Sequence, residues 1–276
     1  MRLSTPTLYH TQNSNSRDLG IPHVIMEHTT MNEKLGILSE ISPTPNDYPT
    51  LNVWCIGNGG HKYAQDATGF PETTRLSHQY IDPFLYSMIP FAARPHSNDF
   101  TEDERKKYFL RRSEKLLDGG NYWVYYAKEI DPITSGSVTK VVNTTEQDFI
   151  PTESLLNLSP VVLSSTEINE LSATKISTYV PVTITLDSSE IEEVLNACRL
   201  KYGNENRAVI SEIALCQSHR FQIEIDVYGN QTATMTEAIG VQTAHHLKTT
   251  SDLTEQRSLF HLKINVGNSE PLIDII

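Results

Sequence analysis

The stretch from Leu186 to Gln217 constrains the fold more than any other part of the chain, because a helix signature leads directly into a strand signature. Asp187 and Glu190 have the spacing of a capping box, with Asp at the N-cap in place of Ser or Thr. An apolar stripe at helical spacing follows, formed by Ile191, Val194, Leu195 and Cys198. Gly203 suits the left-handed position that ends a helix. We therefore predict one well-defined helix near residues 188–203.

The residues after this helix predict a buried strand. Two apolar runs, 208–210 and 213–216, are separated only by Ser211 and Glu212. A nearly continuous apolar run of this length suits a strand that is covered on both faces. We expect this strand to lie under the apolar stripe of the helix, in which Leu195 is central.

Strand signals dominate the rest of the chain. The clearest is a hairpin in which Tyr108–Leu117 and Asn121–Ile130 flank the turn Asp118-Gly119-Gly120. A long helix over 101–117 is the alternative, while Thr101 with Glu104 can cap a short helical turn. Further strands are expected at 52–56, 137–144, 159–164, 175–186, 220–228, 235–246 and 257–267. The pattern predicts a mainly β (α+β) fold of antiparallel sheets with one well-defined helix.

The first 47 residues differ from the rest in composition. They are rich in Ser, Thr, Asn and Pro and have few apolar residues, so we expect an extended N-terminal arm over 1–47. Such an arm must be held by the main body or by a neighbouring subunit, and we expect it to be protease-sensitive in the isolated protein. Residues 48–276 are expected to form a mainly β body, and a division of this body, if there is one, falls near 150–170.

Charge and cysteine content restrict the partners. The 22 basic and 34 acidic residues give a net charge of −12, which argues against nucleic-acid and anionic-membrane partners. The basic cluster over 105–112 is flanked by acidic residues and is interpreted as a solvated face. Three cysteines without short spacings favour reduced, buried thiols. We see no stretch long enough to span a membrane and no signal peptide, and expect folding in a cytoplasm.

No motif in the chain predicts catalysis. The turn Gly57-Asn58-Gly59-Gly60-His61 follows a strand but lacks the Lys-Ser/Thr of a phosphate loop, so we interpret it as a structural turn with positive φ at several positions. Cys55 and His61 are close in sequence, but a thiol inside an apolar strand is inert. His245 and His246 should face opposite sides of a strand, and the carboxylates Glu192-Glu193 should be solvated. We expect no catalytic, cofactor-binding or metal-binding residues and no small-molecule substrate.

Several blocks resemble a known group of proteins. They are Tyr48–His61, MIPFAARP at 88–95, YYAKEID at 125–131 and EVLNACRLKYGNENRAVISEIALC at 193–216. These blocks are similar to virion structural proteins of large contractile-tailed bacteriophages. The resemblance implies a structural subunit, in the neck or tail, that forms homo-oligomers and contacts other virion proteins. It implies a location in the virion after assembly in the host cytoplasm, and no enzymatic activity.

A second resemblance leaves an alternative open. Glu212-Ile213-Ala214-Leu215 is similar to the E-I-G-L strand of tail-collar fibre attachment domains, where a hairpin follows. Ala214 stands where that pattern has Gly, and the Pro-Glu-Thr-Tyr segment expected downstream is missing. This resemblance implies a capsid decoration or fibre-attachment adaptor protein. A virion-associated hydrolase is a third, more distant hypothesis.

Overall fold

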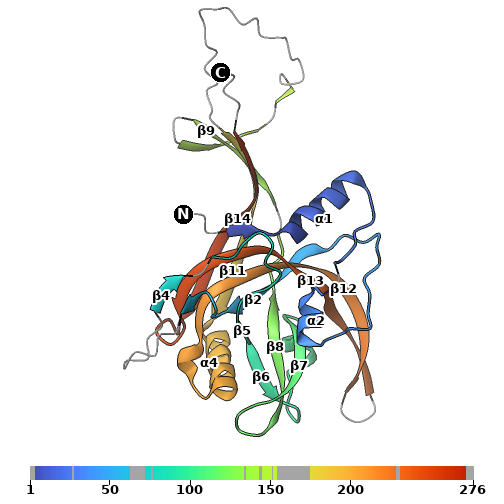
Figure 1. The fold of residues 1–276 in the computed structure, drawn as a ribbon, viewed down its shortest axis with the longest axis vertical. Helices are drawn as coiled ribbons and strands as arrows, with labels where there is room; N and C mark the ends of the chain where they lie inside the picture. Colours follow the sequence, from blue (N-terminus) through green and yellow to red (C-terminus); the bar gives the residue numbers. More distant parts are fainter. Residues whose placement is uncertain are drawn as a thin grey trace, which may run out of the picture. The chain divides into compact units, whose positions relative to one another are not determined.

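The computed structural model confirms a mainly β fold of antiparallel sheets with few helices (Figure 1). It describes residues 4–26, 28–62, 72–75, 77–133, 135–142, 145–150, 152–153, 175–227 and 231–271. The chain forms two compact units: unit 1 holds residues 1–130 and 185–260, and unit 2 holds 131–184 and 261–276. The sequence had indicated a division near 150–170, whereas the units meet along the chain at 130/131, 184/185 and 260/261.

Unit 1 is built on an eight-stranded sheet. Its main path runs through β1 (Ser4–Pro6), β13 (Gln231–Asp252), β12 (Val209–Val227), β2 (Thr50–Gly57), β8 (Asn121–Glu129) and β6 (Ala92–Pro95). Beside this path, β5 (Met88–Ile89) pairs with β2, and β7 (Tyr108–Lys115) pairs with β8. All of these pairings are antiparallel. The strand that follows the well-defined helix therefore lies at the centre of the sheet.

This central strand, β12, is longer than the sequence indicated. Two separate strands were expected over 208–216 and 220–228, but register shifts after Leu215 and Gln217 carry one continuous strand through to Val227. Both faces of β12 are buried as far as His219, as its apolar run predicted. The expected turn at 228–230 lies outside the described residues.

The hairpin around Asp118-Gly119-Gly120 is confirmed. Its arms β7 and β8 pair from Lys115 opposite Asn121 to Tyr108 opposite Lys128. Gly119 has a φ of 83°, which only glycine adopts at little cost. The alternative of a helix over 101–117 is wrong, because α3 (Glu102–Arg105) ends after one capped turn.

The well-defined helix, α4 (Ser188–Tyr202), is also confirmed. The Glu190 N–H donates to the Asp187 carboxylate (2.9 Å), and Gly203 ends the helix with a φ of 74°. The apolar stripe Ile191, Val194, Leu195 and Cys198 is fully buried. Strand β6 lies beside α4, and Arg94 of β6 donates to Glu193 of the helix (2.6 Å). The sequence had indicated that Glu193 is solvated, but its carboxylate is paired with Arg94.

Residues 1–47 are not a continuous extended arm. After β1, they form α1 (Leu8–Leu19) and α2 (Met31–Leu35), and they belong to unit 1. Each helix has a threonine N-cap, Thr7 or Thr30, and ends at a left-handed glycine. The polar residues that indicated an extended arm therefore include the threonines that cap these two helices.

Buried amides of the arm bond to the sheet as well. Asn13 donates to the Pro49 carbonyl (3.0 Å) and to the Gln217 side chain (3.1 Å). Asn32 donates to the Ala238 carbonyl (3.2 Å). Polar side chains thus anchor residues 1–47 where the sequence offers few apolar ones.

One apolar anchor of the arm contacts two thiols. Met31 is fully buried, and its sulfur lies 3.5 Å from Cys55 Sγ on β2 and 4.0 Å from Cys216 Sγ on β12. Burial raises the pKa of Cys55 well above its ordinary value, and the neighbouring Cys216 adds to this effect. All three cysteines of the chain are buried and outside disulfides, as their spacing indicated.

Unit 2 contains a four-stranded sheet in the order β10 (Thr145–Asp148), β9 (Ser137–Val142), β11 (Lys175–Asp187) and β14 (Leu259–Pro271). The strands expected at 137–144, 175–186 and 257–267 correspond to β9, β11 and β14, and the one expected at 159–164 lies outside the described residues. A separate pair in unit 1 joins β3 (His61–Lys62) to β4 (Glu72–Arg75). Among the described residues, no helix has the length and apolar character needed to cross a bilayer.

Candidate functional site

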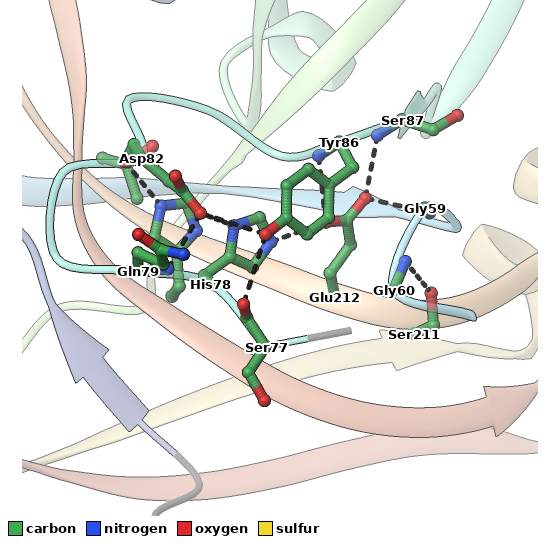
Figure 2. A network of polar contacts seen from close by, with 12 residues as sticks. Gly59, Gly60, Ser77, His78, Gln79, Asp82, Tyr86, Ser87, Ser211 and Glu212 are labelled. Carbon is green, nitrogen blue, oxygen red and sulfur yellow. Dashed lines mark hydrogen bonds and ion pairs between the residues drawn. The ribbon is translucent and has the colours of Figure 1, made fainter. Parts of the chain in front are cut away.

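A group of polar side chains in unit 1 surrounds Glu212 of β12 (Figure 2). The Glu212 side chain is 1% exposed and accepts four hydrogen bonds. Oε1 accepts from the backbone N–H groups of Gly59 and Ser87, both at 2.9 Å. Oε2 accepts from the Tyr86 N–H (3.0 Å) and from His78 Nε2 (2.7 Å). One carboxylate therefore joins β12 to the turn after β2 and to the segment over 77–87.

His78 lies between two carboxylates. Its Nε2 faces Glu212, and its Nδ1 lies 3.3 Å from Oδ2 of Asp82. Both ring nitrogens of His78 therefore face carboxylate oxygens. The ring also stacks between Tyr86 (4.1 Å between centroids) and His246 (3.9 Å). We name His78, Asp82, Tyr86, Glu212 and His246 the Glu212 cluster.

The pKa values of Asp82, Tyr86 and His246 are shifted by burial and by their neighbours in the cluster. Burial alone would raise the pKa of Asp82, but hydrogen bonds from the Gln79 N–H (2.8 Å) and the Tyr86 hydroxyl (3.1 Å), with His78, lower it. Burial and the bond to Asp82 raise the pKa of Tyr86 to about 12. Burial, and then the charge of His78, lower the pKa of His246 to about 4. His246 is therefore neutral near pH 7 and donates from Nε2 to the Asp82 carbonyl (2.9 Å).

The glycines of the turn after β2 make room for this carboxylate. None of Gly57, Gly59 and Gly60 has a positive φ, so the expected left-handed conformations are wrong. A Cβ at Gly57 would instead lie 2.5 Å from Oε1 of Glu212, and one at Gly59 would lie 2.7 Å from the Ser87 nitrogen. These positions need glycine because the backbone passes too close to its neighbours for a side chain.

The arrangement suits a structural role, in which hydrogen bonds hold separate segments together, better than catalysis. Each oxygen of Glu212 already accepts two hydrogen bonds, and both ring nitrogens of His78 face carboxylates. A general base needs a free position within hydrogen-bond reach of its substrate. The His78 side chain is only 5% exposed, so the cluster acts as a buried polar connection between segments of unit 1.

The residues that the sequence singled out are placed in different environments. Gly59 and Glu212 meet within the cluster, as described above. His246 joins the cluster, whereas His245 contacts the ring of His10 (4.5 Å). Cys55 is buried near Cys216, and the side chain of His61 lies outside the described part of the chain. Within the described residues, no three His, Cys, Asp or Glu side chains are arranged to hold a metal ion.

Sequence reasoning did not identify His78, Asp82 or Tyr86. His78 and Glu212 are 134 positions apart, and the segment over 77–87 has no periodic pattern. The only local signals were the glycine-rich turn and a glutamate within the apolar run of β12.

Comparison with known proteins gives one match. A family model described as "Family of unknown function (DUF7208)" matches residues 1–275. No curated protein and no solved structure matches the chain.

Proposed function

Since the chain belongs to DUF7208, a family of unknown function, we propose its role from its own residues and architecture: a structural subunit of a tailed-bacteriophage virion. The subunit acts in the neck or tail through multi-copy assembly with itself and with other virion proteins, and it carries out no reaction. The phage context comes from the resemblance of the blocks between residues 48 and 216. The assembly role is supported by the surface of unit 1.

One surface feature carries the assembly proposal. Four apolar side chains are exposed within the eight residues that begin at the last residue of α1, namely Leu19, Ile21, Val24 and Met26, with exposures of 72%, 49%, 64% and 39%. Their backbone is fixed, because the Tyr48 hydroxyl donates to the Ile21 carbonyl (2.9 Å) and Gln12 donates to the Val24 carbonyl (3.2 Å). Apolar side chains gathered on an ordered surface segment are typical of a protein–protein interface. We name these four residues the 19–26 surface.

The Glu212 cluster supports a second displayed surface. Tyr80, Ile81 and Tyr86 are exposed on the segment that the cluster attaches to β12. An assembly subunit needs rigid surfaces, because a mobile contact residue loses conformational entropy on binding. Two different surfaces on one subunit also permit head-to-tail contacts, which close into rings or continue as filaments.

One observation favours the alternative role as a fibre-attachment adaptor or capsid decoration protein. The segment Glu212-Ile213-Ala214-Leu215 lies in β12, and β12 and β13 form a long hairpin. In tail-collar attachment domains a hairpin follows the E-I-G-L strand, whereas here the strand that carries the segment is itself the first arm of a hairpin, so the likeness is partial.

Imaging of the purified protein tests the assembly role. We expect rings or sheets in negative stain, and their loss in the double variant Leu19→Asp/Val24→Asp, which places charges on the 19–26 surface. Asn15→Asp on α1 is the control, since it adds a charge without removing an apolar contact. Monodisperse wild-type monomers would favour the adaptor role. Mass spectrometry of intact particles of the encoding phage tests the location, and the absence of the protein from them would refute the virion role.

A further inference from the structure

A cavity of about 390 Å³ opens in unit 1 between the arm and the sheet. Apolar residues of the segments 24–26 and 38–45 form much of its lining, and the sheet contributes His219 of β12 and Gly240 of β13. Its volume lies in the range of cavities that bind ligands or side chains. Val24 and Met26 line the cavity and also belong to the 19–26 surface, so the two are continuous.

Two histidines of the lining have side chains without hydrogen-bond partners among the described residues. His23 is 4% exposed, and neither of its ring nitrogens forms a hydrogen bond. Gln242 is close enough to affect the pKa of His23, but its amide does not reach hydrogen-bond geometry with the ring. His219 is 9% exposed, and its ring is also unbonded within this part of the chain. Since a buried polar atom without a partner costs free energy, the cavity favours an occupant with a polar group.

The charges around the cavity restrict that polar group. Burial lowers the pKa of both His23 and His219, so the two rings are neutral near pH 7 and each has one donor and one acceptor nitrogen. A hydroxyl both donates and accepts, so one hydroxyl can bond to both rings. A carboxylate only accepts, and the negative charges of Glu33 in the lining and Asp47 near His219 disfavour it. The lining therefore suits an apolar side chain that ends in a hydroxyl, as tyrosine does.

Tyr80 offers such a side chain at another place on the subunit. It is 46% exposed, its neighbour Ile81 is 60% exposed, and its hydroxyl forms no hydrogen bond within the described residues. Its backbone carbonyl accepts from the Leu8 N–H (3.0 Å), so an anchored segment presents the ring. No residue of the 77–87 segment lines the cavity, so Tyr80 and the cavity are separate on one copy.

We propose that Tyr80 of one copy inserts into the cavity of a neighbouring copy, where its hydroxyl bonds to His23 and His219. Ile81 then packs on the 19–26 surface beside the opening. The proposal deepens the assembly role proposed above and rests on it. Because the contact joins two different surfaces, it can repeat around a ring or along a filament.

Removal of one hydroxyl tests the polar contact. Tyr80→Phe keeps the ring, and we expect roughly tenfold weaker self-association in sedimentation equilibrium. Tyr179→Phe makes the same change in unit 2 and should associate like the wild type. The loss in the double variant Tyr80→Phe/His23→Phe should be smaller than the sum of the two single losses, because both changes remove the same hydrogen bond. Urea unfolding of each variant verifies that it is folded. Additive losses, or no loss in Tyr80→Phe, would overturn the proposal.

Mixing two defective variants tests whether the occupant is a second copy. Tyr80→Ser keeps the cavity and loses the inserted ring, whereas Ser39→Trp places a bulky side chain at the cavity and keeps Tyr80. Neither variant should assemble alone, but the mixture should form one-to-one complexes, because one intact contact remains. A mixture that associates no better than either variant would contradict the proposal. If both variants assemble like the wild type while Leu19→Asp/Val24→Asp does not, this inference fails and the assembly role stands.

Discussion

Glu212 shows how much one buried carboxylate contributes to this fold. Replacing it with Gln keeps the size but removes the charge and presents an NH₂ group to N–H donors. Because two of the four donors around Glu212 would then face an NH₂ group instead of an acceptor in a buried site, we expect Glu212→Gln to lower the free energy of unfolding by about 3 kcal/mol. The midpoint of urea unfolding measures this. Glu224→Gln, at an exposed position of the same strand, should stay within about 0.5 kcal/mol of wild type.

His246 should make the stability depend on pH. Its pKa is lowered from 6.5 to about 4 in the folded protein, so between these values the unfolded chain binds a proton that the folded chain does not. The contribution is therefore complete above pH 6.5 and is lost as the pH falls towards 4. We expect a loss on the order of 3 kcal/mol across this window. The lowered pKa of Asp82 acts below this range, because that carboxyl titrates below 3.8.

A matched pair of variants separates this effect from general acid sensitivity. Urea unfolding at pH 7, 6 and 5 should show a flatter pH dependence for His246→Gln than for the wild type. His261→Gln, which replaces an exposed histidine, should keep the wild-type slope. Parallel slopes in all three proteins would contradict the assignment of this pH dependence to His246.

At this scale, the sequence revealed only parts of the Glu212 cluster. The turn over 57–60 and Glu212 each stood out locally, but for reasons unrelated to their contact. The glycines looked necessary for positive φ, whereas they are necessary for space beside Oε1 of Glu212. His78 has no local pattern at all, because stacking and hydrogen bonding across 134 positions depend on the assembled sheet.

Helix α4 is held by the packing of its apolar stripe. Leu195 is 1% exposed in the middle of its apolar stripe, so Leu195→Ala should leave a cavity and cost about 2–5 kcal/mol. The midpoint of urea unfolding measures this loss of stability. Incorporation of the variant into particles should also fall, because less folded subunit is present. Glu192→Ala is the control, because the Glu192 side chain is 56% exposed and its ion pair with Arg257 (3.3 Å) lies at the surface, so the change should stay within about 0.5 kcal/mol of wild type. A Leu195→Ala variant as stable as the wild type would mean that α4 is not part of the core.

The β7–β8 hairpin depends on one backbone conformation. Gly119 has a positive φ and open space around its Cα, so a side chain there is penalised only through the backbone. Gly119→Val should cost more than about 1 kcal/mol, whereas Gly119→Asn should cost less, since Asn tolerates left-handed angles better. Thermal unfolding of the two variants gives the difference, and equal losses would mean that φ is not the cause.

Elements with complete local signals could be predicted from the sequence. A capping box, an apolar stripe and a terminal glycine defined α4, and a glycine turn between two strand-forming runs defined the β7–β8 hairpin. Residues 1–47 lacked a long apolar stripe, and their helices depend on threonine caps and on buried amides such as Asn13. These amides find their partners only after the distant strands have formed, so composition alone indicated an extended arm.

At the scale of the whole molecule, the arm should be part of the folded subunit. Its contacts with β12 and β13 lead us to expect that residues 4–47 resist proteolysis in the isolated protein, contrary to what composition alone indicates. Limited proteolysis followed by mass spectrometry gives the cleavage sites. Protection that appears only in assembled particles would mean that a neighbouring subunit holds the arm.

The contact between Met31 and the two thiols makes it possible to measure local opening of the core by thiol alkylation. Because Met31 packs against Cys55 and Cys216, we expect a maleimide to alkylate either thiol only after this part of unit 1 has opened. The alkylation rate at low denaturant then measures how often this partial opening occurs, separately from global unfolding. Cys198, on α4, is an internal reference, since its own release reports a different part of unit 1. If the arm also exchanges between subunits during particle maturation, a change in the relative labelling of these thiols would record the exchange.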